Sequence, residues 1–226
     1  IAMGARLAGR GGRDEWVDLG RLWGMVSWLV LTVGLILGSW WAYTILGWGG
    51  YWAWDPVENA ALVPWLVATA FLHSAVVQVR RGMLQSWNFV LVLAAFALTV
   101  LGTFLTRSAV VQSVHSFSQS DVGPPLLVFF VVVVVTGFVL IALRAERIAS
   151  RGGPESLASR EGMFLLNNLL LSLFAFVVLL GTLYPVVLEA ITDEQVSVGR
   201  PFFDRMAVPL GFALLLAMWA GPGTPY

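Results

Sequence analysis

Residues 126–143 read LLVFFVVVVVTGFVLIAL, a stretch of eighteen residues without a single charge. A helix of about 20 predominantly apolar residues crosses the ~30 Å hydrocarbon core of a bilayer. Other parts of the chain have the same character and a comparable length: residues 22–46, 59–79, 88–106 and 163–188, and a last span from about Met206 to Gly221. The sequence therefore predicts an all-α, polytopic transmembrane helical bundle of about six spans, forming a single membrane domain over residues 1–226.

The composition supports the same class. The 226 residues are 58% hydrophobic and 12% charged, whereas a soluble domain carries about 25% charged residues. The formal net charge is zero, and no basic block indicates nucleic-acid binding. Cysteine is absent, so the chain has no disulfide and no thiolate ligand of its own. Because the chain opens on Ile1 in what resembles the end of an earlier helix and stops abruptly at Tyr226, we expect it to be a fragment of a longer protein.

The arginines predict the orientation in the membrane. All 13 basic residues are arginine, and ten of them precede the first span, follow the second, or lie between the fourth and fifth. Only Arg107, Arg200 and Arg205 fall on the other side. The positive-inside rule then places the ten on the cytoplasmic side. Residues 47–59, 107–125 and 189–205 are accordingly predicted to be outward-facing segments.

The segment 47–59 reads GWGGYWAWDPVEN and combines two features. Asp55, Pro56 and Glu58 have the spacing of an N-cap, a first-turn proline and a capping-box acid, which is typical of a helix start. The preceding tryptophans form either an interfacial aromatic belt or a platform for a flat ligand. Glycines permit close approach of such a ligand, and indoles offer rigid apolar surface with one N–H donor each. A planar macrocycle fits this description, and so does an aromatic or quinone-like molecule.

The chain has two histidines, His73 and His115. His73 lies inside the second span, about 25 Å from its start at 1.5 Å per residue. An ionisable side chain inside a membrane helix indicates a functional site, although a hydrogen bond to a neighbouring helix would also explain it. His115 lies in the outer segment 107–125, where a lone histidine is more often simply solvated. The two histidines lie near opposite faces of the membrane and cannot ligate the same metal ion, so there are two sites if both are ligands. Arg107 ends the third span, where it either anchors the helix at the interface or pairs with a ligand carboxylate. Asn167 and Asn168 are predicted to make hydrogen bonds between helices.

Residues 48–59, WGGYWAWDPVEN, resemble the tryptophan-rich "WWD" signature of heme-handling proteins, and their Asp-Pro-Val-Glu-Asn continuation is similar to the CcmF family of cytochrome c maturation. Further similarity extends over nearly the whole chain, in LHS (72–74), GTF (102–104), Arg107-Ser108, SVHSF (113–117), SREGMF (159–164), Asn167-Asn168 and GTL (181–183). The relatives CcmC and CcsA share the tryptophans but continue differently after the aspartate.

The resemblance implies a heme lyase of the bacterial inner membrane whose WWD loop faces the periplasm. Such a protein receives heme from the chaperone CcmE and promotes thioether attachment to the CxxCH motif of apocytochrome c, which CcmH presents. Trp48, Trp52, Trp54 and Asp55 are then the expected heme-handling surface, with Arg107 as a candidate propionate partner.

In the same family one histidine pair ligates the substrate heme and another holds an intramembrane b heme, which keeps the substrate iron reduced. His115 matches the first pair and His73 the second. Imidazole is a common axial ligand of heme iron. Each pair lacks one member in this chain, as expected of a fragment. A quinol is the expected reductant. Two alternatives remain: a heme carrier or export component of the CcmC or CcsA type, and a quinone-binding membrane protein.

Overall fold

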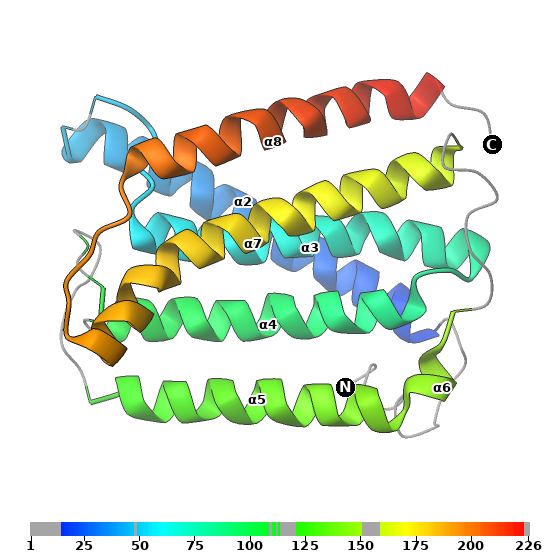
Figure 1. Ribbon diagram of the computed structural model, residues 1–226. Coiled ribbons are helices and arrows are strands. Elements are labelled where there is room, and N and C mark those ends of the chain that lie inside the picture. The colour runs from blue at the N-terminus through cyan, green and yellow to red at the C-terminus, as the bar shows by residue number, and fades with distance from the viewer. Residues whose placement is uncertain are drawn as a thin grey trace.

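The computed structural model describes residues 15–47, 49–108, 110–111, 113, 121–150 and 159–223. Six long helices account for most of these residues (Figure 1). They are α2 (Glu15–Ile45), α3 (Pro56–Arg81), α4 (Gln85–Arg107), α5 (Gly123–Leu143), α7 (Arg160–Thr192) and α8 (Arg200–Ala220). Two short elements, α6 (Ala145–Ile148) and the 3-10 turn η1 (Gly221–Gly223), complete the described structure. All six long helices are long and apolar enough to cross a membrane. The predicted all-α bundle of six spans is confirmed.

Several element ends differ from the predicted ones. The outward-facing segment predicted at 107–125 ends earlier, because α5 begins at Gly123 with a proline in its first turn, a position where the missing N–H costs nothing. The outward-facing segment predicted at 189–205 is shorter in the structure and spans residues 193–199, because α7 continues to Thr192 and α8 begins at Arg200. The first span likewise begins earlier than predicted, at Glu15.

Helix α3 occupies the centre of the bundle. It packs against α2, α4 and α7, while α5 packs on α4 and α8 packs on α7 (Figure 1). Because successive long helices alternate in direction, the bundle has two distinct ends. We call the end with residues 46–55, where α2 ends and α3 begins, the tryptophan end. The opposite end, where α3 ends and α7 begins, is the arginine end.

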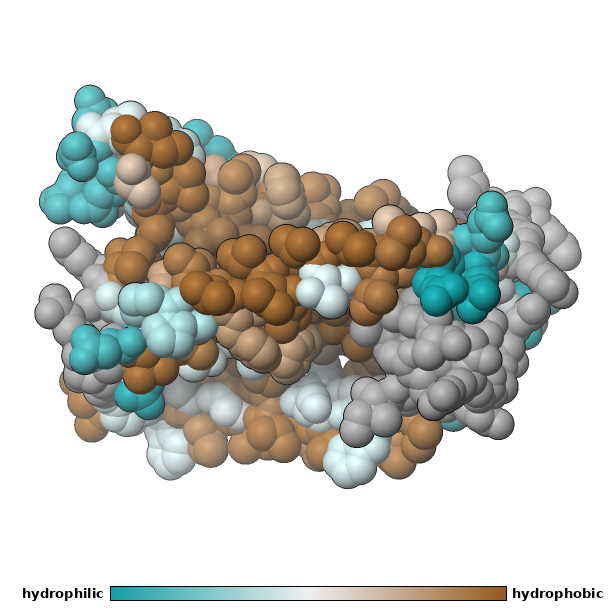
Figure 2. Space-filling model, turned by 90° about the horizontal axis from the view of Figure 1, so that it is seen from below, coloured by the Kyte–Doolittle hydropathy of each residue, from teal (hydrophilic) through white to brown (hydrophobic). Residues whose placement is uncertain are grey.

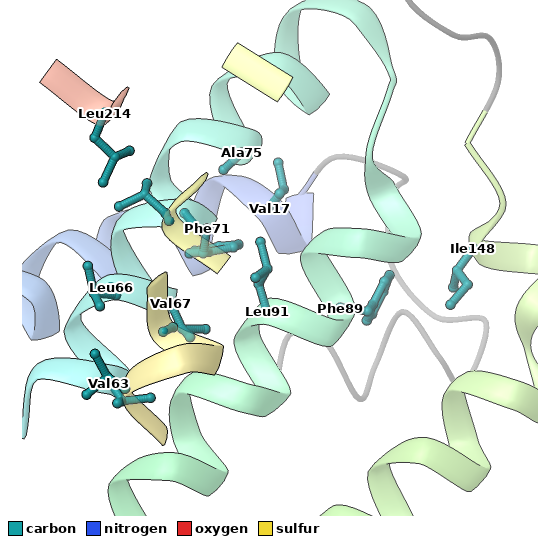
Figure 3. Close-up of a cluster of buried hydrophobic side chains, with 14 of the residues drawn as sticks. Val17, Val63, Leu66, Val67, Phe71, Ala75, Phe89, Leu91, Ile148 and Leu214 are labelled. Atoms are coloured by element: carbon teal, nitrogen blue, oxygen red, sulfur yellow. The ribbon is translucent and has the colours of Figure 1, made fainter. Parts of the chain in front are cut away.

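Buried apolar side chains on α3 form the middle of the core. Val63, Leu66, Val67 and Phe71 are each at most 6% exposed, and they lie close to Leu91 of α4 (Figure 3). These side chains recur every three or four residues and therefore form one continuous buried face of α3.

Hydrogen bonds between tryptophan and threonine join α2 to α3. Trp28 Nε1 donates to Thr69 Oγ1 at 2.8 Å, and Trp65 Nε1 donates to Thr32 Oγ1 at 2.7 Å. The two indoles stack at 5.9 Å. Such polar pairs hold helices together where surrounding lipid provides no hydrophobic driving force.

The outer helices expose apolar side chains on the outside of the bundle. Gly123 is the one buried residue of α5, and Val128 and Leu143 on the same helix are 64% and 73% exposed. Figure 2 shows hydrophobic side chains in a broad band across this side, with hydrophilic residues toward the two ends. A band of this kind matches a bilayer core between two polar interfaces.

Candidate functional sites at the two ends of the bundle

The tryptophan-rich segment connects α2 to α3 through left-handed backbone positions. Gly47 and Gly49 have φ of +66° and +71°, which glycine adopts readily. Trp54 also has a positive φ, of +60°, a conformation that is uncommon for a residue with a Cβ and persists only where surrounding contacts enforce it. The tertiary contacts of Trp54 must therefore explain the conformation of this segment.

The predicted helix start is confirmed. Asp55 is the N-cap of α3, and its Oδ2 accepts from Val57 N at 3.0 Å. Glu58 completes the capping box, because its Oε2 accepts from Asp55 N at 3.2 Å and from Ala53 N at 3.0 Å. Asp55 Oδ2 also accepts from Ser113 Oγ at 2.7 Å. One carboxylate thus joins the start of α3 to the segment that leads toward residue 115.

Trp54 lies against α8. Its ring stacks on Phe203 at 5.3 Å with an interplanar angle of 13°, and its Nε1 donates to Asp204 Oδ1 at 2.8 Å. Its carbonyl oxygen accepts from Asn59 Nδ2 at 3.1 Å, and the same amide donates to Thr182 Oγ1 of α7 at 3.1 Å. Contacts with two other helices therefore hold Trp54 in its left-handed conformation.

The indoles of Trp52 and Trp54 do not share one flat face. Their rings meet edge to face, 6.0 Å apart at 86°. Trp52 Nε1 is buried and has no hydrogen-bond partner in the described part of the chain. Tyr51 stacks on Tyr43 of α2 at 4.4 Å. Trp54 is thus an anchor of the segment, and Tyr51 contacts α2. Trp48 and His115 lie outside the described residues.

His73 faces a pocket at the other end of the bundle. The pocket has a volume of about 530 Å³ and lies between α3, α7 and α8, a size typical of small-molecule and cofactor sites. Its apolar walls include Val77, Met163, Phe164 and Met218. The His73 ring lies 6.2 Å from that of Phe164. As predicted, helix α3 separates His73 from the tryptophan-rich segment, by about 25 Å between Asp55 and His73.

Asn167 of α7 contacts the His73 ring. Its Nδ2 lies 3.4 Å from His73 Nδ1, and its buried Oδ1 has no hydrogen-bond partner in the described structure. The oxygen and nitrogen of an amide are assigned by their partners. Turning the Asn167 amide by 180° lets Oδ1 accept a hydrogen bond from Nδ1–H of His73. Nε2 is then the basic nitrogen, the state in which histidine ligates a metal.

The neighbouring Asn168 forms the predicted interhelical bonds. Its Nδ2 donates to Ala70 O of α3 at 2.6 Å, and its Oδ1 accepts from Trp87 Nε1 of α4 at 2.5 Å. This residue therefore has a structural role in joining α3, α4 and α7. Arg107 ends α4 at the tryptophan end, and its pairing with a ligand stays a prediction.

Four residues that hold the tryptophan-rich segment were not predicted from the sequence: Asn59, Thr182, Phe203 and Asp204. Asn59 ends the Asp-Pro-Val-Glu-Asn run that begins at Asp55, but its partner on α7 is 123 positions away. Asp204 lies 150 positions from Trp54. Within the described ranges, no group of three or more His, Cys, Asp or Glu side chains could hold a metal ion by themselves.

Comparison with known proteins agrees with this architecture. Residues 14–113 match the family model "Cytochrome C assembly protein". The chain is 49% identical to "Cytochrome c-type biogenesis protein CcmF" of Pseudomonas aeruginosa over 93% of its own length and 32% of the relative's. It is 45% identical to "Cytochrome c-type biogenesis protein ccl1" of Rhodobacter capsulatus over 90% of its length and 31% of the relative's.

A solved structure, "Cytochrome c Heme Lyase CcmF", superposes with a TM-score of 0.76 at 40% identity and covers 100% of this chain and 33% of that one. The six apolar spans define a polytopic helical membrane protein, and its relatives are named as proteins of cytochrome c biogenesis. More narrowly, the chain belongs to the CcmF family. It spans about a third of the length of the relatives it matches.

Proposed function

We propose that this chain is part of a heme lyase of the bacterial inner membrane that attaches heme to apocytochrome c. Heme is the substrate at the tryptophan end, and a second heme, of the b type, is held in the pocket of His73. The pocket carries this proposal, because a CcmF-family fold brings an intramembrane histidine, a polar amide and apolar walls together around about 530 Å³.

The residues of the pocket fit a heme. His73 supplies an imidazole whose Nε2 is the basic nitrogen when Asn167 Oδ1 accepts from Nδ1–H, and the buried Oδ1 is otherwise without a partner in the described residues. Phe164, Met163 and Val77 offer apolar surface to a porphyrin. When bound, a heme in this pocket supplies one-electron redox chemistry.

At the tryptophan end, we propose that Trp52 and Trp48 contact the substrate heme and that His115 ligates its iron. Trp54 and Asp55 act by fixing the segment, since Trp54 is held by α8 and Asp55 binds Ser113. Ser113 stands two positions before His115 in the sequence. Asp55 thereby ties the tryptophan-rich segment to the segment that carries the proposed ligand.

The remaining parts of the proposal concern orientation and partners. The excess of arginine at one end of the bundle supports a cytoplasmic arginine end and a periplasmic tryptophan end. The partners would be the heme chaperone CcmE, apocytochrome c presented by CcmH, and a quinol as reductant. The relatives' role in cytochrome c-type biogenesis supports this setting.

An absorption spectrum and a pyridine hemochrome assay of the detergent-purified full-length protein test the proposal. We expect a b-type spectrum in the wild type, its loss in His73→Ala, and its retention in His115→Ala, with cytochrome c assembly blocked in the latter. A wild-type protein that carries no b heme would overturn the intramembrane site and favour a heme carrier of the CcmC type. Quinone in place of heme would favour a quinone-binding protein.

A further inference from the structure

The polar groups of the His73 pocket lie at two separate levels. His73 and Asn167 form the deep level, toward the middle of the membrane-spanning bundle. The second level, at the arginine end, contains Arg80, Arg81 and Arg160 together with Glu161. Apolar side chains occupy the walls between them. A ligand that fills this pocket therefore meets a nitrogen ligand at one end and guanidinium groups at the other.

Sequence spacing on two antiparallel helices produces the two levels. Arg80 follows His73 by seven residues on α3, and Arg160 precedes Asn167 by seven residues on α7. A seven-residue step returns to nearly the same face of a helix and rises about 10 Å. Two contacts fix how α3 and α7 are aligned along their length. Asn167 contacts His73 at the deep level. At the arginine level, Glu161 Oε1 lies 2.6 Å from Arg81 Nη2.

The arginine level carries an excess of positive charge. Three guanidinium groups and one carboxylate line it, which leaves a net charge of +2 on these four side chains. Arg81 forms the ion pair with Glu161. Arg80 and Arg160 add two further cations at the same level. Guanidinium groups bind carboxylates through paired N–H donors, so this level is suited to a ligand with anionic oxygens.

We propose that Arg80 and Arg160 bind the propionate carboxylates of the heme whose iron His73 ligates. The inference rests on the proposed b heme of this pocket and adds its orientation, with the carboxylates toward the arginine end. A heme whose iron His73 held would place its apolar ring against the apolar walls of the pocket and its two carboxylates toward the arginine level. The phosphate of an anionic lipid offers similar oxygens, and the experiment separates the two sources.

The test compares iron protoporphyrin IX with its dimethyl ester, which has the same ring and no carboxylates. Full-length protein is depleted of heme in detergent and titrated with each porphyrin, with absorbance as the readout. We expect the wild type to bind the ester more weakly by about tenfold or more, the scale of hydrogen bonds to charged groups. The single variants Arg80→Gln and Arg160→Gln should each lose part of this preference, and the double variant most of it. Arg144→Gln, outside the pocket, should keep it.

Each result of this titration either supports the propionate assignment or overturns it. Equal affinity of the wild type for acid and ester overturns the proposal, and this arm needs no variant to fold. An undiminished preference in the double variant also overturns it. The titration is repeated with anionic lipid added to the micelles, and loss of the preference there assigns the arginine level to lipid phosphate instead. If the wild type binds neither porphyrin and shows no His73-dependent spectrum, the proposed b heme itself fails, which is a distinct result. A shift of the propionate bending band in resonance Raman spectra of Arg160→Gln would support the assignment independently.

Discussion

Replacing Asn59 by leucine tests whether tertiary contacts hold Trp54 in its left-handed conformation. Asn59 is 1% exposed, and its Nδ2 donates to Trp54 O and to Thr182 Oγ1, each at 3.1 Å. Loss of two neutral hydrogen bonds costs about 1–3 kcal/mol. Leucine also removes Oδ1, a buried acceptor without a partner in the described structure, so we expect a net loss near the lower end of that range. A left-handed residue with a side chain stores about 1–3 kcal/mol. The two energies are comparable, and the segment should therefore relax.

The assay is unfolding in mixed micelles with increasing SDS, followed by circular dichroism, for Asn59→Leu, Thr182→Val and the double variant. The coupling between Asn59 and Thr182 should be about 0.6 kcal/mol, the average for interhelical hydrogen bonds in a membrane protein. Thr99→Val serves as a control, because exposed Thr99 donates its hydroxyl to Ala95 O of its own helix. Amide exchange at residues 52–57 should increase in Asn59→Leu. Unchanged stability together with unchanged exchange would refute the reasoning.

Substitutions at Gly181, Asn167 and Ser113 address the remaining contacts. Gly181→Ala should lower stability and displace Phe203 from Trp54, because a Cβ there would lie 2.6–2.8 Å from the rings of Phe202 and Phe203. Gly211→Ala, whose Cβ would have no neighbour within 4 Å, should do neither, and equal thermal shifts for the two would contradict this packing. Asn167→Leu should weaken heme retention in the His73 pocket. Asn167→Asp should retain heme and lower its midpoint potential, because a carboxylate makes the imidazole a stronger donor. A redox titration measures this potential, and an unchanged value would argue against the contact between Asn167 and His73. Ser113→Ala should reduce binding of added heme at the tryptophan end and leave the b-type spectrum intact, and loss of both signals would speak for general unfolding.

The spans and the helix start at Asp55 could be predicted because their causes are local. Apolar length is set by the thickness of the bilayer core, and a helix satisfies its own backbone hydrogen bonds. The capping box involves residues three positions apart. Span ends were less well predicted: Gly123-Pro124-Pro125 is compatible both with a loop and with a first helical turn, and the structure has the turn.

The sequence by itself determined six apolar helices, an excess of arginine at one end and a tryptophan-rich segment at the other. Only the tertiary structure decided the orientation of the Trp54 ring, since its partners Phe203 and Asp204 are on α8. It also decided that Asn167 meets His73, 94 positions away, and that the two seven-residue steps on α3 and α7 face one another across a pocket. The physical reason is that bilayer thickness and backbone hydrogen bonding dictate where a helix runs. Its rotation and its neighbours depend on side-chain packing between residues distant in the chain.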